Sequence, residues 1–171
     1  MYLDSYITDT ITKDASSASY WWIPITYTTM MDLNFNRTRP SHWLRGEKTL
    51  EINNIDVSNL HWIIMNIQQT GYYRVNYDET NWNLIITYLN NERQYHKISP
   101  ANRAQIIDDS LNLARGGYLN YNTAMDITKY LKHETDYVPW KAAISALNFI
   151  DSMLISSSEY HKFKVFCITK K

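Results

Sequence analysis

The chain has 171 residues, of which 44% are hydrophobic and 14% aromatic, and 17 Lys+Arg residues balance 17 Asp+Glu residues. This composition supports a packed core and excludes wholesale disorder, and the length suits one medium domain or two small ones. A net charge of zero argues against nucleic acid as a partner, because phosphate binding requires a basic patch. The single cysteine excludes an internal disulfide bond. No apolar run reaches the roughly 18 residues of a membrane-spanning helix, and the first residues lack the features of a signal peptide.

The first 77 residues are predicted to form short antiparallel strands. Residues 20–29 are rich in β-branched and aromatic side chains, which favours a strand, and Pro24 within them suggests an edge position or a bulge. Residues 61–68 and 72–77 are two further strand candidates, separated by the turn-forming pair Thr70-Gly71. Weaker candidates lie at residues 2–7, 43–44 and 49–57. We expect a small antiparallel β-sandwich, or most of one.

The hydrophobic period changes from 2 to 3.6 after residue 77, which indicates helices. Asp78 is the predicted N-cap of the first of them, and Gly116-Gly117 the predicted stop of the second. The four expected helices cover about 78–90, 100–115, 121–132 and 139–154. The sequence therefore predicts an α+β chain, with a β-sandwich domain at residues 1–77 and the start of an antiparallel helical array at residues 78–171.

The sequence His133-Glu134-Thr135-Asp136-Tyr137 comes nearest to a metal motif. A zinc helix of the HExxH type needs two histidines one turn apart to bind the metal, and a glutamate to activate water. Here Tyr137 occupies the place of the second histidine, and Pro139 follows where the helix should continue. A polar turn between two helices is the better interpretation, and we assign no metal ligand to it.

No other group of residues forms a catalytic pattern. The histidines show no metal spacing, and adjacent Asp108 and Asp109 do not share a helix face, so a proton-sharing pair is disfavoured. Capping and ion pairing explain these aspartates and the arginines on the same helix better. The aromatic stretch 20–22 is predicted to feed the core rather than to form a contact surface. The groups considered are His42, His61, His96, His133, His161, Arg103, Arg115, Ser16-Ser17, Ser156–Ser158 and Cys167. We predict no catalytic residue and no metal ligand in this chain.

One modification motif is present. Asn36-Arg37-Thr38 is an N-glycosylation sequon in a loop-like stretch. Such a tripeptide is used only when the chain enters the secretory pathway, so Asn36 is a conditional acceptor site.

Three segments carry a family resemblance: WWIPITYTT (21–29), QQTGYYRVNYDETNW (68–82) and a long stretch from PANRAQ to YVPW (100–140). In this order and spacing they resemble the aminopeptidase N family, the zinc-dependent membrane alanyl aminopeptidases of the gluzincin type. The resemblance covers roughly residues 20–155. It implies that residues 1–77 correspond to most of a β-sandwich domain. The residues from 78 onward would then correspond to the opening helices of a C-terminal domain that caps the active site.

The resemblance also implies a parent enzyme that uses zinc to remove N-terminal residues from peptides at the extracellular face of the plasma membrane. The family's HExxH zinc site and its motif for the substrate's amino group are both absent from this chain. No catalytic or zinc residue is therefore carried over, and the chain is expected to bind no zinc and to be inactive alone. It looks like a fragment or a truncated product of such an enzyme. The alternative is a stand-alone interaction module, which would bind a partner through exposed aromatic residues or the open end of its helical array.

Overall fold

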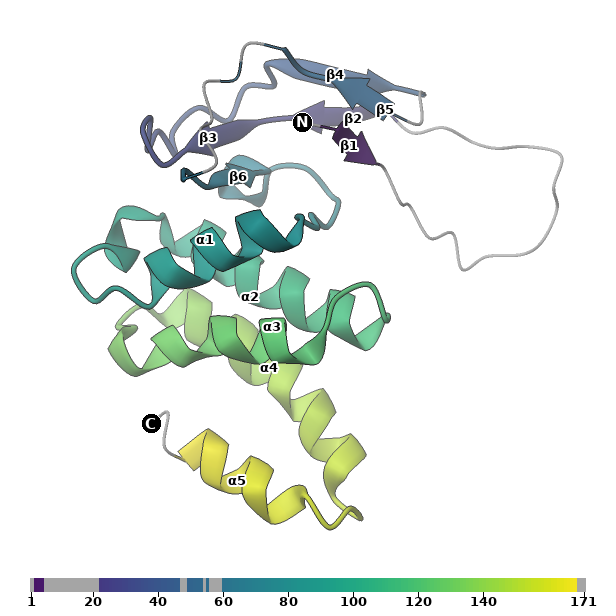
Figure 1. Cartoon of the computed structure of the whole chain (residues 1–171), viewed down its shortest axis with the longest axis vertical. Coiled ribbons are helices and arrows are strands. Elements are labelled where there is room, and N and C mark those ends of the chain that lie inside the picture. The colour runs from purple at the N-terminus through teal and green to yellow at the C-terminus, as the bar shows by residue number, and fades with distance from the viewer. Residues whose placement is uncertain (1, 5–21, 47–48, 54, 56–59, 169–171) are drawn as a thin grey trace, which may run out of the picture.

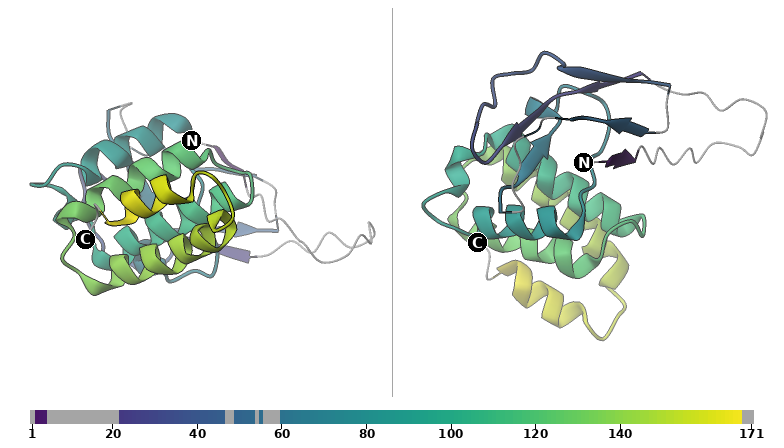
Figure 2. Two further views of the ribbon diagram at one scale, coloured as in Figure 1. Left: turned by 90° about the horizontal axis from the view of Figure 1, so that it is seen from below. Right: turned by 45° about the horizontal axis from the view of Figure 1, so that its top comes forward.

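The computed structural model describes residues 2–4, 22–46, 49–53, 55 and 60–168. In these residues the strands all precede residue 66, and the α-helices follow residue 78. The strands lie together at one end of the molecule, and the helices are stacked beneath them (Figures 1 and 2). The predicted α+β class, with antiparallel strands followed by helices, is confirmed.

The described strands form three antiparallel pairs. They are β1 (Tyr2–Asp4) with β5 (Thr49–Glu51), β2 (Trp22–Ile25) with β4 (His42–Arg45), and β3 (Tyr27–Thr29) with β6 (Ile63–Met65). In the second pair Ile23 lies opposite Leu44, and in the third Thr28 lies opposite Ile64. Each sheet has only two strands, so tertiary packing must supply most of its stability.

The strand predicted over residues 20–29 is divided at Thr26 within its described part. The Thr26 carbonyl accepts a hydrogen bond from the Asn66 N–H at 2.9 Å, and the Thr26 hydroxyl oxygen accepts one from the Ile67 N–H at 2.8 Å. The chain thus changes partners at this residue, from β4 on one side to β6 on the other. Residues 20 and 21 of this prediction lie outside the described part.

The predicted strand at residues 72–77 is wrong. These residues form bends and irregular backbone and pair with no strand, because their hydrogen-bonding groups have other partners. The Val75 N–H donates to a carboxylate on a helix at 3.0 Å, and the Tyr73 hydroxyl donates to the Pro24 carbonyl at 2.8 Å. The strand predicted over 61–68 is also shorter, because a 3-10 turn, η1 (Ile67–Gln69), follows β6.

The predicted signals that start and stop the first two helices are confirmed. Helix α1 (Glu79–Leu89) begins after Asp78, whose side chain accepts from the Asn81 N–H, and helix α2 (Pro100–Arg115) has Pro100 in its first turn. Gly117 follows α2 with a φ of 78°, a left-handed conformation that favours glycine. The 3-10 turn η2 (Tyr95–Lys97) lies between the two helices.

The later helices differ in their ends from the prediction. Helix α3 (Tyr121–Thr128) gives way to the 3-10 segment η3 (Lys129–His133), and α4 (Tyr137–Leu154) begins two residues before Pro139. A fifth helix, α5 (Tyr160–Ile168), was not predicted, because residues 156–171 carry no clear apolar stripe. It packs against α4.

Strand β6 belongs to two hydrophobic cores. Its alternate residues Ile63 and Met65 pack with Ile25 and Val75 between the strands. Ile64, together with Trp62 just before the strand and Ile67 just after it, packs into the core formed by α1 to α4. The period-2 geometry of a strand explains this division, since successive side chains point to opposite faces. In Figure 1 β6 lies between the other strands and α1. The β segment and the helices therefore share a buried strand.

Candidate functional site

Helix α2 is the centre of the helical part, where it packs against α3, α4 and η1. Because neighbours cover it on several sides, its polar residues are buried along with its apolar ones. Those with buried side chains include Asn102, Arg103, Gln105, Asp109 and Ser110. A buried polar group must find a hydrogen-bond partner or lose free energy, so each of these residues requires one. These residues belong to two polar clusters, one around Asp109 and the other around Arg103.

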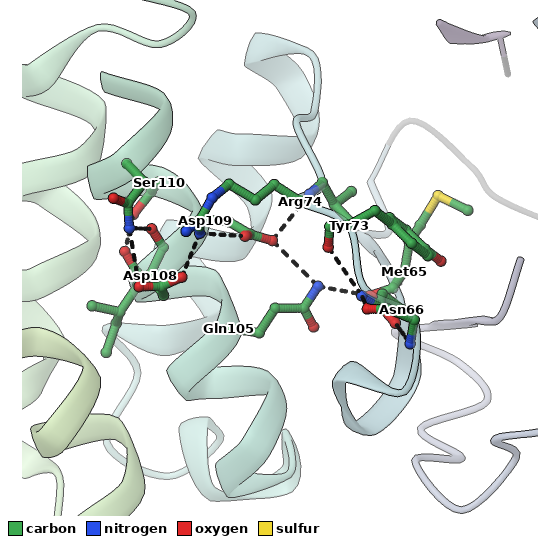
Figure 3. A network of polar contacts seen from close by, with 12 residues as sticks. Met65, Asn66, Tyr73, Arg74, Gln105, Asp108, Asp109 and Ser110 are labelled. Carbon is green, nitrogen blue, oxygen red and sulfur yellow. Dashed lines mark hydrogen bonds and ion pairs between the residues drawn. The ribbon is translucent and has the colours of Figure 1, made fainter. Parts of the chain in front are cut away.

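The first, the junction cluster, consists of Asn66, Arg74, Gln105, Asp108 and Asp109, and ties the chain after β6 to α2 (Figure 3). The Arg74 guanidinium donates to Asp108 and, at 3.3 Å, to Asp109 Oδ1. Asp109 Oδ2 accepts from the Val75 backbone N–H at 3.0 Å and from Gln105 Nε2 at 3.3 Å. Gln105 Nε2 also lies 3.4 Å from the carbonyl of Met65 in β6. The Asp109 carboxylate therefore accepts hydrogen bonds from Arg74 and Val75 in the segment after β6 and from Gln105 in α2.

Asn66 organises the backbone beside this carboxylate. Its Oδ1 accepts from the Gly71 N–H at 2.8 Å, and its Nδ2 donates to the Gly71 carbonyl at 2.9 Å. Asn102 of α2 donates to the Asn66 carbonyl at 3.2 Å and accepts from the Gln68 N–H at 2.9 Å. Asn66, Gln68 and Gln69 have φ values of 54–58°, which are uncommon for residues other than glycine. These hydrogen bonds hold the turn in that conformation, a requirement for such strain to persist.

The charges of the junction cluster are unequally solvated. Burial raises the pKa of Asp109 to about 6, although the Val75 N–H and the Arg74 cation both act to lower it. Burial by itself would lower the pKa of Arg74, but the hydrogen bond and charge of Asp108 and the charge of Asp109 raise it overall. Burial also raises the pKa of Tyr73 and Tyr77, with Asp109 adding to both shifts. The cluster thus contains one carboxylate that titrates near pH 6.

A hollow of about 500 Å³ lies beside this cluster, lined by Gln69, Thr70, Gly71, Tyr72, Tyr73, Arg74 and Asp108. Tyr72 at its rim is fully exposed, and the Arg74 charge is already neutralised by two carboxylates. The lining has no nucleophile next to a general base, which covalent catalysis requires. Its groups suit a structural joint rather than a reaction.

The second, the inter-helix cluster, consists of Arg103, Glu134 and Asp136. Arg103 forms a two-pronged pair with Glu134, through Nε at 2.7 Å and Nη2 at 3.0 Å, and Nη2 also reaches Asp136 at 2.5 Å. The Arg103 guanidinium lies 5.3 Å from the centre of the Tyr95 ring. Burial would raise the pKa of Glu134, but its hydrogen bond with Arg103 and those from the following backbone N–H groups lower it overall. This cluster joins α2 to the start of α4.

The structure gives His133-Glu134 a role that the sequence analysis did not predict. His133 is the last residue of η3, and Glu134 lies between η3 and α4, so the predicted position between two helices holds for Glu134. However, the Glu134 side chain is fully buried against Arg103 rather than solvated in a polar turn. His133 Nδ1 lies 3.8 Å from Glu92 Oε1. Among the described residues no group of three or more His, Cys, Asp or Glu side chains could hold a metal ion. The donor set at Glu134 does not fit zinc, because its carboxylate is already bound by a guanidinium.

The other candidates of the sequence analysis are scattered. Asp108 and Asp109 are ion-paired as predicted, but their partner is Arg74 of the β segment. Arg115 instead lies over the Phe149 ring, 3.7 Å from its centre. Histidines 42, 61, 96 and 161 lie in β4, before β6, in η2 and in α5. Ser156–Ser158 are exposed between α4 and α5. Ser16-Ser17 and the Cys167 side chain lie outside the described part.

The prediction that the aromatic stretch feeds the core is wrong for Trp22. Its side chain is 66% exposed, and the Arg45 guanidinium lies 5.5 Å from its ring centre. Alternation along β2 explains the error, since Ile25 is buried on one face while Trp22 lies on the other, opposite Arg45. Asn36 lies in an exposed loop, and its use as a glycosylation site stays a prediction.

Sequence reasoning missed Arg74, Gln105, Asn66 and Asn102 as members of a polar network. In the sequence they occur as ordinary polar residues between apolar ones. The one available signal was the adjacent pair Asp108-Asp109 next to the apolar residues Ile106 and Ile107, which indicates a nearby cation but not which one.

Comparison with known proteins identifies the family. The family model described as ERAP1-like C-terminal domain matches residues 62–170. The chain is 43% identical over 153 residues to aminopeptidase N of Plutella xylostella, and this match covers 89% of the chain. The chain belongs to the aminopeptidase N family. It is also 35% identical over 167 residues to aminopeptidase N of Rattus norvegicus, covering 96% of the chain. It is 45% identical over 107 residues, or 63% of the chain, to the thyrotropin-releasing hormone-degrading ectoenzyme of Mus musculus.

The chain is much shorter than these relatives. It spans 16% of the length of the Plutella and rat aminopeptidases and 10% of the mouse ectoenzyme. The matched family model begins at residue 62, so it includes β6 and both polar clusters. The resemblance noted from the sequence is confirmed, and the chain is homologous to the C-terminal region of these enzymes.

Proposed function

We propose that this chain forms the junction between the β-sandwich and the helical cap of a zinc-dependent aminopeptidase that removes N-terminal residues from peptides. The junction cluster is the observation that carries the proposal. Arg74 and Val75 on the β side both bind Asp109 on the helical side. The shared strand β6 packs into the hydrophobic cores of both sides. A joint of this kind transmits the position of one part to the other.

The proposal assigns the catalytic and zinc-binding residues to parts of the parent enzyme outside this chain. Zinc in the parent would act as a Lewis acid on the scissile carbonyl, and peptides would be the substrates. In this assignment residues 1–77 belong to the β-sandwich domain and residues 78–171 to the start of the cap. Family membership supports it.

We further propose that the parent enzyme lies at the extracellular face of the plasma membrane. The support is the names of two relatives, a membrane alanyl aminopeptidase of Heliothis virescens and the mouse ectoenzyme. In the described part of the chain, no helix is both long and apolar enough to cross a membrane.

A chimera tests the assignment. The chain replaces its matched segment in the Plutella aminopeptidase N, and the purified product is assayed for zinc content and for hydrolysis of an aminoacyl chromogenic substrate. We expect a zinc-containing, active chimera, whereas the isolated 171-residue chain holds no zinc and is inactive. Within the chimera, Asp109→Lys places a second cation beside Arg74 and should lower turnover without changing zinc content. Asn83→Ala, at an exposed position on α1, is the matched control and should leave both unchanged.

Two outcomes contradict the proposal. Stoichiometric zinc and chelator-sensitive turnover in the isolated chain would place the chemistry within it. A chimera that folds and binds zinc but has no activity, combined with an isolated chain that unfolds cooperatively, would favour the stand-alone interaction module.

A further inference from the structure

The loop between β3 and β4 presents four consecutive exposed residues, 36–39. They contain Asn36-Arg37-Thr38, the sole Asn-X-Ser/Thr triplet in the 171 residues. An acceptor asparagine has to reach the site of an enzyme, so exposure of the whole triplet is the first requirement.

Both flanks of this loop are attached to the body of the molecule. Phe35, next to Asn36, is buried in the helical core, and its carbonyl accepts from Gln68 Nε2 at 3.2 Å. On the same side, the Asn34 N–H donates to the Thr28 hydroxyl oxygen at 2.9 Å. On the other side, the Ser41 N–H donates to the Ile25 carbonyl at 3.0 Å. Asn36 therefore lies in an anchored loop and is exposed, next to the buried Phe35.

The reacting side chains are not engaged elsewhere. Across the described residues, no hydrogen bond involves the Asn36 carboxamide or the Thr38 hydroxyl, although the backbone of the turn is bonded. The Thr38 N–H donates to the Asn36 carbonyl at 3.0 Å, and the Asn36 N–H donates to Asn34 Oδ1 at 3.1 Å. Arg37 between them pairs with Asp32 at 3.4 Å. A modification at Asn36 would therefore break no hydrogen bond between that side chain and the described residues.

We propose that Asn36 is an N-glycosylation site. The co-reactant is an oligosaccharide linked to a lipid diphosphate. The Asn36 amide nitrogen forms a bond to the anomeric carbon of the first sugar, while the bond from that carbon to the diphosphate oxygen breaks. The lipid diphosphate leaves with the electron pair, and the proton lost from the amide passes to a base of the transferase. The site rests on the proposed function in one respect, since the chain must enter the secretory pathway.

A glycan at Asn36 has a structural consequence for the parent enzyme. A bulky, hydrated chain on the β3–β4 loop excludes another protein domain from that side of the β segment. The catalytic part of the enzyme must then pack on a different face of this chain.

The test expresses the full chain behind a cleavable secretion leader in insect cells, together with a secreted reporter of known glycosylation. We expect wild type and Thr38→Ser to carry a glycan that an amide-cleaving endoglycosidase removes, converting residue 36 to aspartate in the peptide mass spectrum. Asn36→Gln and Thr38→Ala are expected to carry none. Secretion of wild type without a glycan, while the reporter is modified, would overturn the site.

A second measurement tests the structural argument. Because the Asn36 side chain is exposed and its carboxamide forms no hydrogen bond with the described residues, removal of the glycan should leave the cooperative unfolding transition in place. If the chain with the glycan lacked the cooperative transition and the chain without the glycan showed it, the proposed geometry would be overturned. The chimera separates this site from the proposed function: an active chimera without a glycan refutes only the site, and a glycosylated but inactive chimera refutes only the proposed function.

Discussion

Each of the two polar clusters of α2 pairs an arginine with carboxylates, yet the pKa of the buried carboxylate shifts in opposite directions in the two clusters. In the inter-helix cluster both partners are buried, and the side chains of Arg103 and Glu134 are only 2% and 0% exposed. The guanidinium donates hydrogen bonds to both carboxylate oxygens of Glu134. In the junction cluster Arg74 is 47% exposed and shared between two aspartates, while Asp109 is 3% exposed. The pKa of Glu134 is lowered and that of Asp109 is raised to about 6. Burial favours the neutral form in both, so the quality of the pairing decides the direction.

The two clusters therefore respond to acid with opposite signs. Glu134 has a lower pKa in the folded chain, so its contribution to the free energy of unfolding is present above its unfolded pKa and is lost as pH falls through the folded value. Asp109 has a higher pKa in the folded chain, so its contribution is present at low pH and is lost as pH rises through about 6. The following variants sharpen or break this contrast, from the largest expected effect to the smallest.

Arg103→Met should cause the largest loss. It leaves Glu134 buried without its cation, and breaking a buried pair in this way costs about 3–5 kcal/mol of unfolding free energy. Urea unfolding at pH 7 measures the loss. Arg103→Met combined with Glu134→Gln should lose less, because the neutral amide still accepts from the Thr135 and Asp136 N–H groups. Arg93→Met, at an exposed position, is the control. Equal losses in the single and double variants would contradict a buried charge as the cause.

Asp109→Asn should remove a pH dependence. The folded pKa of about 6 exceeds the ordinary aspartate value of 3.8, so wild type loses up to about 3 kcal/mol of unfolding free energy between about pH 4 and pH 6 through this group. The asparagine variant lacks this slope, and its oxygen can still accept from the Val75 N–H. Subtracting its unfolding free energy from that of wild type across pH 4–8 isolates the effect. A difference that grows as pH rises would show that the pKa of Asp109 is lowered.

Asn81→Ala tests the neutral counterpart of these ionic contacts. Asn81 on α1 accepts from the Ile63 N–H and donates to the Ile63 carbonyl, both at 2.9 Å. These hydrogen bonds between neutral groups connect β6 to α1. Loss of the Asn81 side chain leaves buried backbone groups unpaired and should cost about 1–3 kcal/mol, independent of pH. Asn83→Ala, two residues later and exposed, should change the unfolding free energy by less than about 0.5 kcal/mol. Similar losses at both positions would indicate helix propensity as the cause.

Arg74→Met should have the smallest effect on the unfolding free energy, below about 1 kcal/mol at neutral pH, because the arginine is half exposed and screened by solvent. Its effect on the titration is more informative. Loss of the cation leaves burial less opposed, so the pKa of Asp109 should rise further above 6. The midpoint of the pH-dependent difference from the Asp109→Asn variant reports this shift. A midpoint that moves to lower pH would show that Arg74 is not the partner.

The sequence predicted the first two helices well because their signals are local. Asp78 as an N-cap and Gly117 after a helix each act within a few residues of their own position. The β segment was harder, because strand pairing depends on distant partners. Residues 72–77 alternate like a strand, but the Val75 N–H is taken by Asp109, 34 residues later.

The candidate site shows the same division between local and distant information. The absence of an HExxH pattern at His133-Glu134 was readable from spacing. The burial of Glu134 was not, because its partner Arg103 lies 31 residues earlier on another helix.

The sequence by itself determined the family, the change from strands to helices near residue 78, and the ends of α1 and α2, because these depend on local chemistry and on recognisable segments. Only the tertiary structure decided which polar side chains of α2 are buried, that β6 serves two cores, and that Arg74 and Arg103 have different carboxylate partners. The physical reason is that burial and pairing are properties of the neighbours a residue acquires on folding. A stripe of apolar residues predicts that a helix packs, but not how many of its sides are covered.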